Sequence, residues 1–131
     1  MSFMLDTNVV SDLIRNPKGN AARQFALVSR QSSISIIVAA ELRYGAEEKN
    51  SYKLSARVDQ MLDALKIETF DPPAHRIYGT IRALLERRGQ PIGSNDFLIA
   101  AHALALDSTL VTDNEDEFSR VPGLKIENWL K

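Results

Sequence analysis

The stretch Phe3-Met4-Leu5-Asp6-Thr7-Asn8 decides the expected fold, because a short apolar run stops abruptly at three polar residues. The apolar run predicts a buried strand. Asp, Thr and Asn predict that a helix follows at once, since their side chains accept hydrogen bonds from the free N–H groups of a first helical turn. Apolar residues then recur at helical spacing from Val9 to Ile14, and Pro17 stops the helix. The chain therefore opens with a strand, a turn and a helix.

The remainder of the chain alternates short apolar segments with helical patterns. We expect strands at residues 33–38, 67–70 and 109–112, a last edge strand at 124–126, and a closing anchor at Trp129-Leu130. We expect helices at residues 20–29, 39–45, 51–64, 74–88 and 97–106, and an acidic loop or short helix at 113–118. This alternation predicts an α/β fold with a central, mainly parallel sheet of four to five strands flanked by helices in three layers. With no repeat or linker, residues 1–131 should form one domain.

The composition limits the chemistry that the chain can perform. Its 131 residues contain 16 Lys and Arg against 17 Asp and Glu, and the net charge of −1 excludes nucleic-acid binding through bulk positive charge alone. The absence of cysteine excludes disulfides, thiolate zinc sites, iron–sulfur clusters and cysteine nucleophiles. Two histidines cannot form a three-histidine metal site. Any metal must be held mainly by oxygen, which favours Mg²⁺ or Mn²⁺ over zinc.

The sequence contains no recognisable secretory signal and no membrane span. The apolar residues at the N-terminus are interrupted by Asp6, and no segment approaches the roughly 20 apolar residues that a span requires. We therefore expect a cytoplasmic protein.

Acidic residues follow several of the expected strands. Asp6 follows the first strand, Glu41 lies shortly after the second, and Asp96 opens the apolar helix before the fourth. Asp113, Asn114, Asp116 and Glu117 follow the fourth strand. Because the carboxyl ends of parallel strands meet at one edge of a sheet, these acids should gather there. Clustered carboxylates repel one another unless a cation compensates, which suggests a hard divalent metal and metal-assisted hydrolysis of phosphodiesters.

Each of these residues also has a structural interpretation. Asp6 can cap a helix, Glu41 can be a solvated helix residue, Asp96 can be a favourable charge near a helix N-terminus, and the acids of 113–117 can form a solvated loop. We expect His102 to be a core or interface histidine and His75 a surface or capping residue. The basic side chains are either solvated helix faces or a rim of phosphate contacts; they are Arg15, Lys18, Arg23, Arg30, Arg82, Arg87 and Arg88.

Four motifs together resemble the PIN-domain ribonucleases of the VapC toxin type, from prokaryotic toxin–antitoxin pairs. They occur in the order and spacing of that family and cover essentially the whole chain. They are Met4-Leu5-Asp6-Thr7-Asn8, Ala40-Glu41-Leu42-Arg43-Tyr44-Gly45, Pro91-Ile92-Gly93 with Asp96-Phe97-Leu98-Ile99-Ala100-Ala101-His102-Ala103, and Leu110-Val111-Thr112-Asp113-Asn114 with Glu117-Phe118.

The resemblance implies a PIN-like fold, an Mg²⁺- or Mn²⁺-dependent endoribonuclease activity, and three metal-binding acids, Asp6, Glu41 and Asp96. Asn114 stands where many relatives carry a fourth acid, so Asp113, Asn114 or Glu117 would complete the catalytic set. Polar support of the pocket would come from Thr7, Asn8, Thr112 and Asp113. RNA contacts would come from Arg43, Arg82 and Arg87.

The resemblance also implies partners. They are a VapB-type antitoxin, a second copy of the chain in a homodimer, operator DNA bound through the antitoxin, and an RNA substrate. The PIGxxD-containing subgroup resembles enzymes that cut initiator tRNA in the anticodon stem-loop, which would inhibit translation. The amphipathic stretch from Leu54 to Leu65, with Tyr44, would contact the antitoxin or the second copy, unless it is ordinary core packing.

Two other functions remain as alternatives. A non-catalytic PIN-fold module would only dock a partner in a complex or help to repress its own operon. A phosphoacceptor receiver domain also gathers acids at strand ends. It needs a lysine after a late strand, however, and no such lysine follows Val111-Thr112-Asp113.

Overall fold

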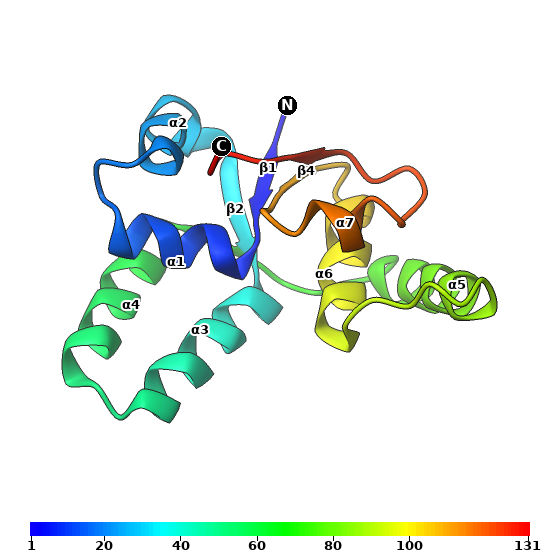
Figure 1. Ribbon diagram of the computed structural model, residues 1–131, viewed down its shortest axis with the longest axis horizontal. Coiled ribbons are helices and arrows are strands. Elements are labelled where there is room, and N and C mark those ends of the chain that lie inside the picture. The colour runs from blue at the N-terminus through cyan, green and yellow to red at the C-terminus, as the bar shows by residue number, and fades with distance from the viewer.

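A computed structural model describes all residues, 1–131, and its five strands form one parallel sheet in the order β3-β2-β1-β4-β5 (Figure 1). The strands are β1 (Phe3–Leu5), β2 (Ser32–Ser35), β3 (Lys66–Glu68), β4 (Thr109–Val111) and β5 (Ile126–Glu127). β1 lies in the centre, where Phe3 is level with Ser32 of β2 and with Thr109 of β4. The predicted α/β class and parallel sheet are confirmed.

Helices flank the sheet on both sides, as the alternation of elements predicted. α1, α3 and α4 pack together on one side, whereas α5 and α6 pack against each other on the other side (Figure 1). The helices are α1 (Thr7–Arg15), α2 (Asn20–Val28), α3 (Ile36–Lys49), α4 (Tyr52–Ala64), α5 (Ala74–Arg87), α6 (Ser94–Ala105) and α7 (Glu115–Phe118), with a 3₁₀ turn at Ser29–Gln31. None of them is both long and apolar enough to cross a membrane.

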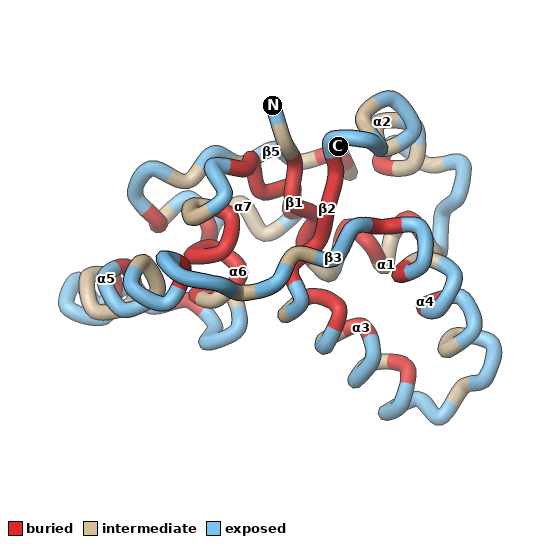
Figure 2. The backbone as a smooth tube through the Cα atoms, turned by 180° about the vertical axis from the view of Figure 1, so that it is seen from behind, coloured by how far each residue is buried: buried red, intermediate tan, exposed pale blue.

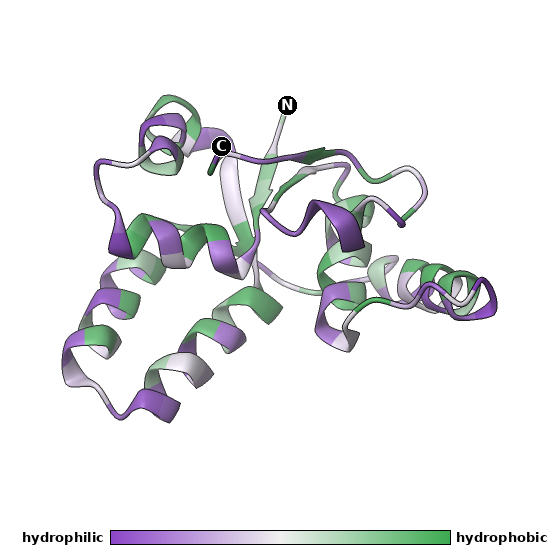
Figure 3. Cartoon of the chain, viewed as in Figure 1, coloured by the Kyte–Doolittle hydropathy of each residue, from purple (hydrophilic) through white to green (hydrophobic).

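One hydrophobic core of 28 buried residues runs through the molecule and includes the central strands. β1 and β4 are buried along their whole length, as expected for parallel strands covered on both faces (Figure 2). Hydrophobic residues dominate these strands and much of α6, whereas α3 and α4 alternate hydrophobic and hydrophilic stretches (Figure 3). Trp129 closes the core against Phe3, with 5.5 Å between ring centroids. The buried core thus fixes the end of β1, and Asp6 follows that end directly.

The predicted strand at 33–38 is wrong in its second half. β2 ends at Ser35, and residues 36–38 already belong to α3, which extends beyond the predicted 39–45. The Ser35 hydroxyl accepts a hydrogen bond from the N–H of Ile37 at 3.0 Å and so caps the helix. β-branched residues in an apolar run do not distinguish a buried strand from a buried first helical turn. Smaller shifts occur elsewhere, since β3 covers 66–68, α6 begins at Ser94 and β5 covers only 126–127.

Candidate active site

Asp6 lies at the carboxyl end of the central strand and is only 5% exposed. Its Oδ1 accepts a hydrogen bond from the N–H of Thr7, and its Oδ2 accepts one from the hydroxyl of Thr112, both at 2.8 Å. Burial raises the pKa of Asp6. These hydrogen bonds partly oppose that shift, and the charges of Glu41 and Asp113 reinforce it. The side chain is therefore a helix cap, as one interpretation predicted, and also a carboxylate held in an acidic environment.

Glu41 projects from the second turn of α3 and links three helices. Its Oε1 accepts a hydrogen bond from the hydroxyl of Thr7 in α1, and its Oε2 accepts one from the Asn95 amide in α6 at 3.3 Å. Its charge contributes to raising the pKa of both Asp6 and Asp96, so the three predicted acids are electrostatic neighbours. Sequence reasoning missed Asn95, although its place directly before Asp96 could have suggested it.

Asp96 lies in the first turn of α6, half-buried beside the other acids. Burial, a hydrogen bond shared with Glu117, and the charges of Asp6, Glu117 and Glu41 raise the pKa of Asp96 to about 7. Gly93 also adjoins this carboxylate: a Cβ there would lie only 3.1 Å from Asp96 Oδ2. The glycine leaves one side of the carboxylate uncovered, a role that sequence reasoning did not assign.

The polar residues after β4 hydrogen-bond to one another, to Asp6 and to Asn8. The buried Thr112 hydroxyl accepts a hydrogen bond from the N–H of Asn114 at 3.0 Å while donating to Asp6. The Asn114 amide donates to Glu117 at 2.8 Å, and the Asn8 amide donates to Asp113 at 3.1 Å. Asn114 thus orients Glu117, and Glu117 is the acid of this segment that helps to raise the pKa of Asp96.

No basic side chain compensates these acids. The five ion pairs of the chain are Arg43–Asp59, Lys66–Glu68, Arg82–Glu86, Lys125–Asp107 and Lys131–Glu115, and none includes Asp6, Glu41, Asp96, Asp113 or Glu117. In this arrangement, no three His, Asp or Glu side chains converge closely enough to hold an ion. The chemistry nevertheless fits a hard divalent cation, because the donors are oxygens and carry uncompensated negative charge. Binding one would require these carboxylates to turn toward a common point.

The other predicted residues lie outside this cluster. His102 is a core histidine, as expected, with Nδ1 2.7 Å from the Ser35 hydroxyl, although its buried Nε2 has no partner. His75 is exposed. Arg43 pairs with Asp59. The Arg82 guanidinium lies 5.8 Å from the Tyr78 ring centroid and 5.6 Å from that of Phe97; Arg87 is exposed at the end of α5.

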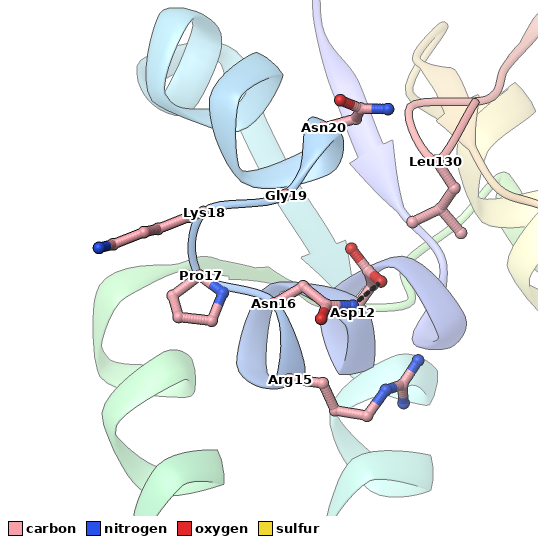
Figure 4. Close-up of a pocket in the computed structure, with 8 residues that line it drawn as sticks. All are labelled: Asp12, Arg15, Asn16, Pro17, Lys18, Gly19, Asn20 and Leu130. Carbon is pink, nitrogen blue, oxygen red and sulfur yellow. Dashed lines mark hydrogen bonds between the residues drawn. The ribbon is translucent and has the colours of Figure 1, made fainter.

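Among the cavities beside α1, two differ in whether they reach the acids. The larger, about 540 Å³, lies at the loop between α1 and α2 and is lined by none of the clustered acids (Figure 4). A smaller pocket of about 210 Å³ lies among α1, α3 and α4, and both Thr7 and Glu41 line it. The chemistry of the site therefore belongs to the smaller pocket and the acids beside it.

Comparison with known proteins places the chain in a family. The PIN domain family model matches residues 3–124. The chain is 40% identical to Ribonuclease VapC2 of Rickettsia felis over 100% of both chains, and 38% identical to the tRNA(fMet)-specific endonuclease VapC of Salmonella typhimurium over 98% of each.

Solved structures agree with this placement. The Rickettsia felis VapBC2 complex, bound to a DNA fragment from its promoter, superimposes with a TM-score of 0.91 at 39% identity, covering 98% of this chain and 99% of the other. The DNA-bound VapBC of Salmonella typhimurium gives 0.91 at 38% identity over 98% of each. The expected resemblance is confirmed, and the chain belongs to the VapC family of PIN-domain proteins.

Proposed function

We propose that this chain is a divalent-metal-dependent endoribonuclease toxin of a type II toxin–antitoxin system. The observation that carries the proposal is the cluster of Asp6, Glu41 and Asp96 at the carboxyl edge of the sheet, which no Lys or Arg neutralises. The family adds support, because full-length relatives are named ribonucleases. A non-catalytic module would have no need for mutually repelling carboxylates in a partly buried cluster.

Asp6, Glu41 and Asp96 would hold Mg²⁺ or Mn²⁺. When bound, such a cation lowers the pKa of water and neutralises charge on a phosphodiester as it is hydrolysed. Thr7 and Asn95 hold Glu41 by hydrogen bonds, and Thr112 holds Asp6. Glu117 contributes to raising the pKa of Asp96, and Asp96 must be deprotonated to serve as a ligand.

We propose initiator tRNA, cut in the anticodon stem-loop, as the substrate, because relatives 35–38% identical are named tRNA(fMet)-specific endonucleases.

We also propose a VapB-type antitoxin and, through it, operator DNA, because related VapC chains are solved in VapBC complexes on DNA. This function fits a cytoplasmic, single-domain protein that acts as a homodimer. Of the proposed RNA contacts, Arg87 is exposed and without an ion pair, whereas Arg43 and Arg82 already pair with acids.

Induced expression of the chain should arrest growth and produce new RNA 5′ ends within the anticodon loop of initiator tRNA. Sequencing RNA 5′ ends after induction would show this, and Asp6→Asn serves as the inactive control. Co-expression of its VapB-type antitoxin should restore growth. Normal growth with an unchanged set of 5′ ends would support the non-catalytic binding module instead. Cleavage confined to another RNA would correct the substrate alone.

A further inference from the structure

We propose that the pocket among α1, α3 and α4 binds the nucleotide adjacent to the scissile phosphate, with its base in the pocket and its next phosphate at the far rim. This inference rests on the proposed ribonuclease function and adds a binding site for part of its substrate. The pocket is continuous with the acids, because Thr7 and Glu41, which bond to each other, line its near end. Its volume of about 210 Å³ suits one flat ring system rather than a folded RNA helix.

Two helix faces form the walls of the pocket. Each wall runs from the acid cluster to a basic side chain. Thr7, Ser11 and Arg15 follow one another at four-residue spacing on α1, and Glu41, Gly45 and Lys49 do so on α3. Residues at this spacing share one face of a helix, and eight residues span about 12 Å. Both walls therefore begin at the linked Thr7 and Glu41 side chains, and both end in a cation.

The far rim is free to take an anion. Arg15 and Lys49 are exposed, and neither belongs to any ion pair in the chain. Arg15 also lines the larger cavity, and Figure 4 shows its side chain extending away from Lys18 and the loop between α1 and α2. Unpaired cations on both walls of one pocket are suited to a phosphate, since phosphate contacts of RNA-binding proteins come largely from Arg and Lys.

The floor between the two ends is apolar. Leu42, Ala46 and Val58 of the core line it together with the partly buried Ile14 and Leu54, and a base face can bury the apolar area that these two leave exposed. At Gly45 no atom lies within 4 Å of the position that a Cβ would occupy, so the pocket extends to the backbone of α3. A base can therefore approach the helix closely at this point.

RNA fits this order of groups better than a peptide does. The acids at the near end would receive a phosphate together with a cation. The RNA chain must then continue from that phosphate along the surface beside the acids. This pocket offers an apolar floor followed by two cations, which matches a base followed by a phosphate. A peptide would need a basic group at the acids and an acidic group at Arg15 and Lys49, with an apolar segment between them.

Gly45→Leu tests the proposal, because it fills the pocket from a position where the chain itself leaves room. Leucine is also the better helix former, so the variant should fold with an unchanged or higher melting temperature. Gly79→Leu is the matched control: it is another helix-interior glycine with no atom within 4 Å of its Cβ position, and it lies on α5, outside the pocket. Binding of short fluorescein-labelled single-stranded RNAs, measured by anisotropy with Ca²⁺ in place of Mg²⁺ or Mn²⁺, gives a readout separate from cleavage.

Gly45→Leu should weaken RNA binding about tenfold, the effect of losing the apolar contact of one base, while Gly79→Leu binds as the unchanged chain does. Lys49→Gln should lower the slope of log K against log salt concentration by about 0.7, as expected for one phosphate contact on a single strand. Unchanged RNA binding by Gly45→Leu would overturn the proposal. If that variant also lost its co-expressed antitoxin, the pocket would be a peptide site. Failure of the unchanged chain to cleave any RNA would instead refute the proposed function, which the binding assay does not test.

Discussion

Replacing Asp96 by asparagine should reduce metal-dependent RNA cleavage by about a thousandfold or more. Asparagine keeps the shape of the side chain but removes the charge that would hold the cation beside Asp6 and Glu41. A single-turnover cleavage assay, with Mg²⁺ or Mn²⁺ present, measures the loss. Asp116→Asn is the matched control, because it removes one charge from the exposed surface of α7 and should leave the rate unchanged. Cleavage by Asp96→Asn at the rate of this control would remove Asp96 from the mechanism.

The same substitution should make the folded chain more stable in EDTA. The folded state raises the pKa of Asp96 from 3.8 to about 7, so it binds this proton more tightly than the unfolded chain does. The resulting stabilisation is fully present below pH 3.8 and is lost as the pH rises to about 7. At pH 8 the folded chain therefore carries an unfavourable charge, which Asp96→Asn removes.

Because Asp96 is only half-buried, we expect a gain of about 1 kcal/mol, or about 4 °C in melting temperature, at pH 8. At pH 4 the difference between the two chains should nearly vanish. Thermal unfolding of both chains at the two pH values measures this. A variant less stable than the unchanged chain at pH 8 would contradict the electrostatic account of the site.

Trp129→Ala should cost about 3–5 kcal/mol of unfolding free energy, a large share of the roughly 5–15 kcal/mol that stabilises a domain. The indole is 6% exposed, packs against Phe3 of the central strand, and donates from Nε1 to Glu127 at 3.0 Å. Urea denaturation measures the loss. Leu106→Ala is the control, because that side chain is 42% exposed and should change stability by less than about 1 kcal/mol.

Trp129→Phe should recover much of the stability, since it restores an aromatic contact with Phe3. Cleavage per folded molecule should be unchanged in all three variants, because Trp129 and Leu106 lie outside the acid cluster. A cost below about 1 kcal/mol for Trp129→Ala would show that the C-terminal residues do not anchor the core.

Much of the fold could be predicted from local patterns. The end of β1 and the start of α1 were evident, because three apolar residues meet three residues that cap helices. The boundary between β2 and α3 was not. There the run Ile34-Ser35-Ile36-Ile37-Val38 fits both structures, and only the cap made by Ser35 decides between them. Tertiary packing, which the sequence pattern does not reveal, places that turn.

The site was predictable where topology alone determines it. Asp6, Glu41 and Asp96 meet because parallel strands end at one edge of the sheet. The orienting contacts were not predictable, because the Asn95–Glu41 and Asn114–Glu117 hydrogen bonds depend on side-chain rotamers. For the same reason, sequence spacing could not show how close Gly93 comes to the Asp96 carboxylate.

Calorimetric titration of Mn²⁺ into the purified chain tests the central claim most directly, namely that these acids form a metal site. At pH 7 the chain should bind Mn²⁺ and release a fraction of a proton, seen as a heat that varies with the ionisation enthalpy of the buffer, because Asp96 is then partly protonated. Asp6→Asn should bind far more weakly. Equal Mn²⁺ binding by the unchanged chain and by Asp6→Asn, with no proton release in either, would contradict the account.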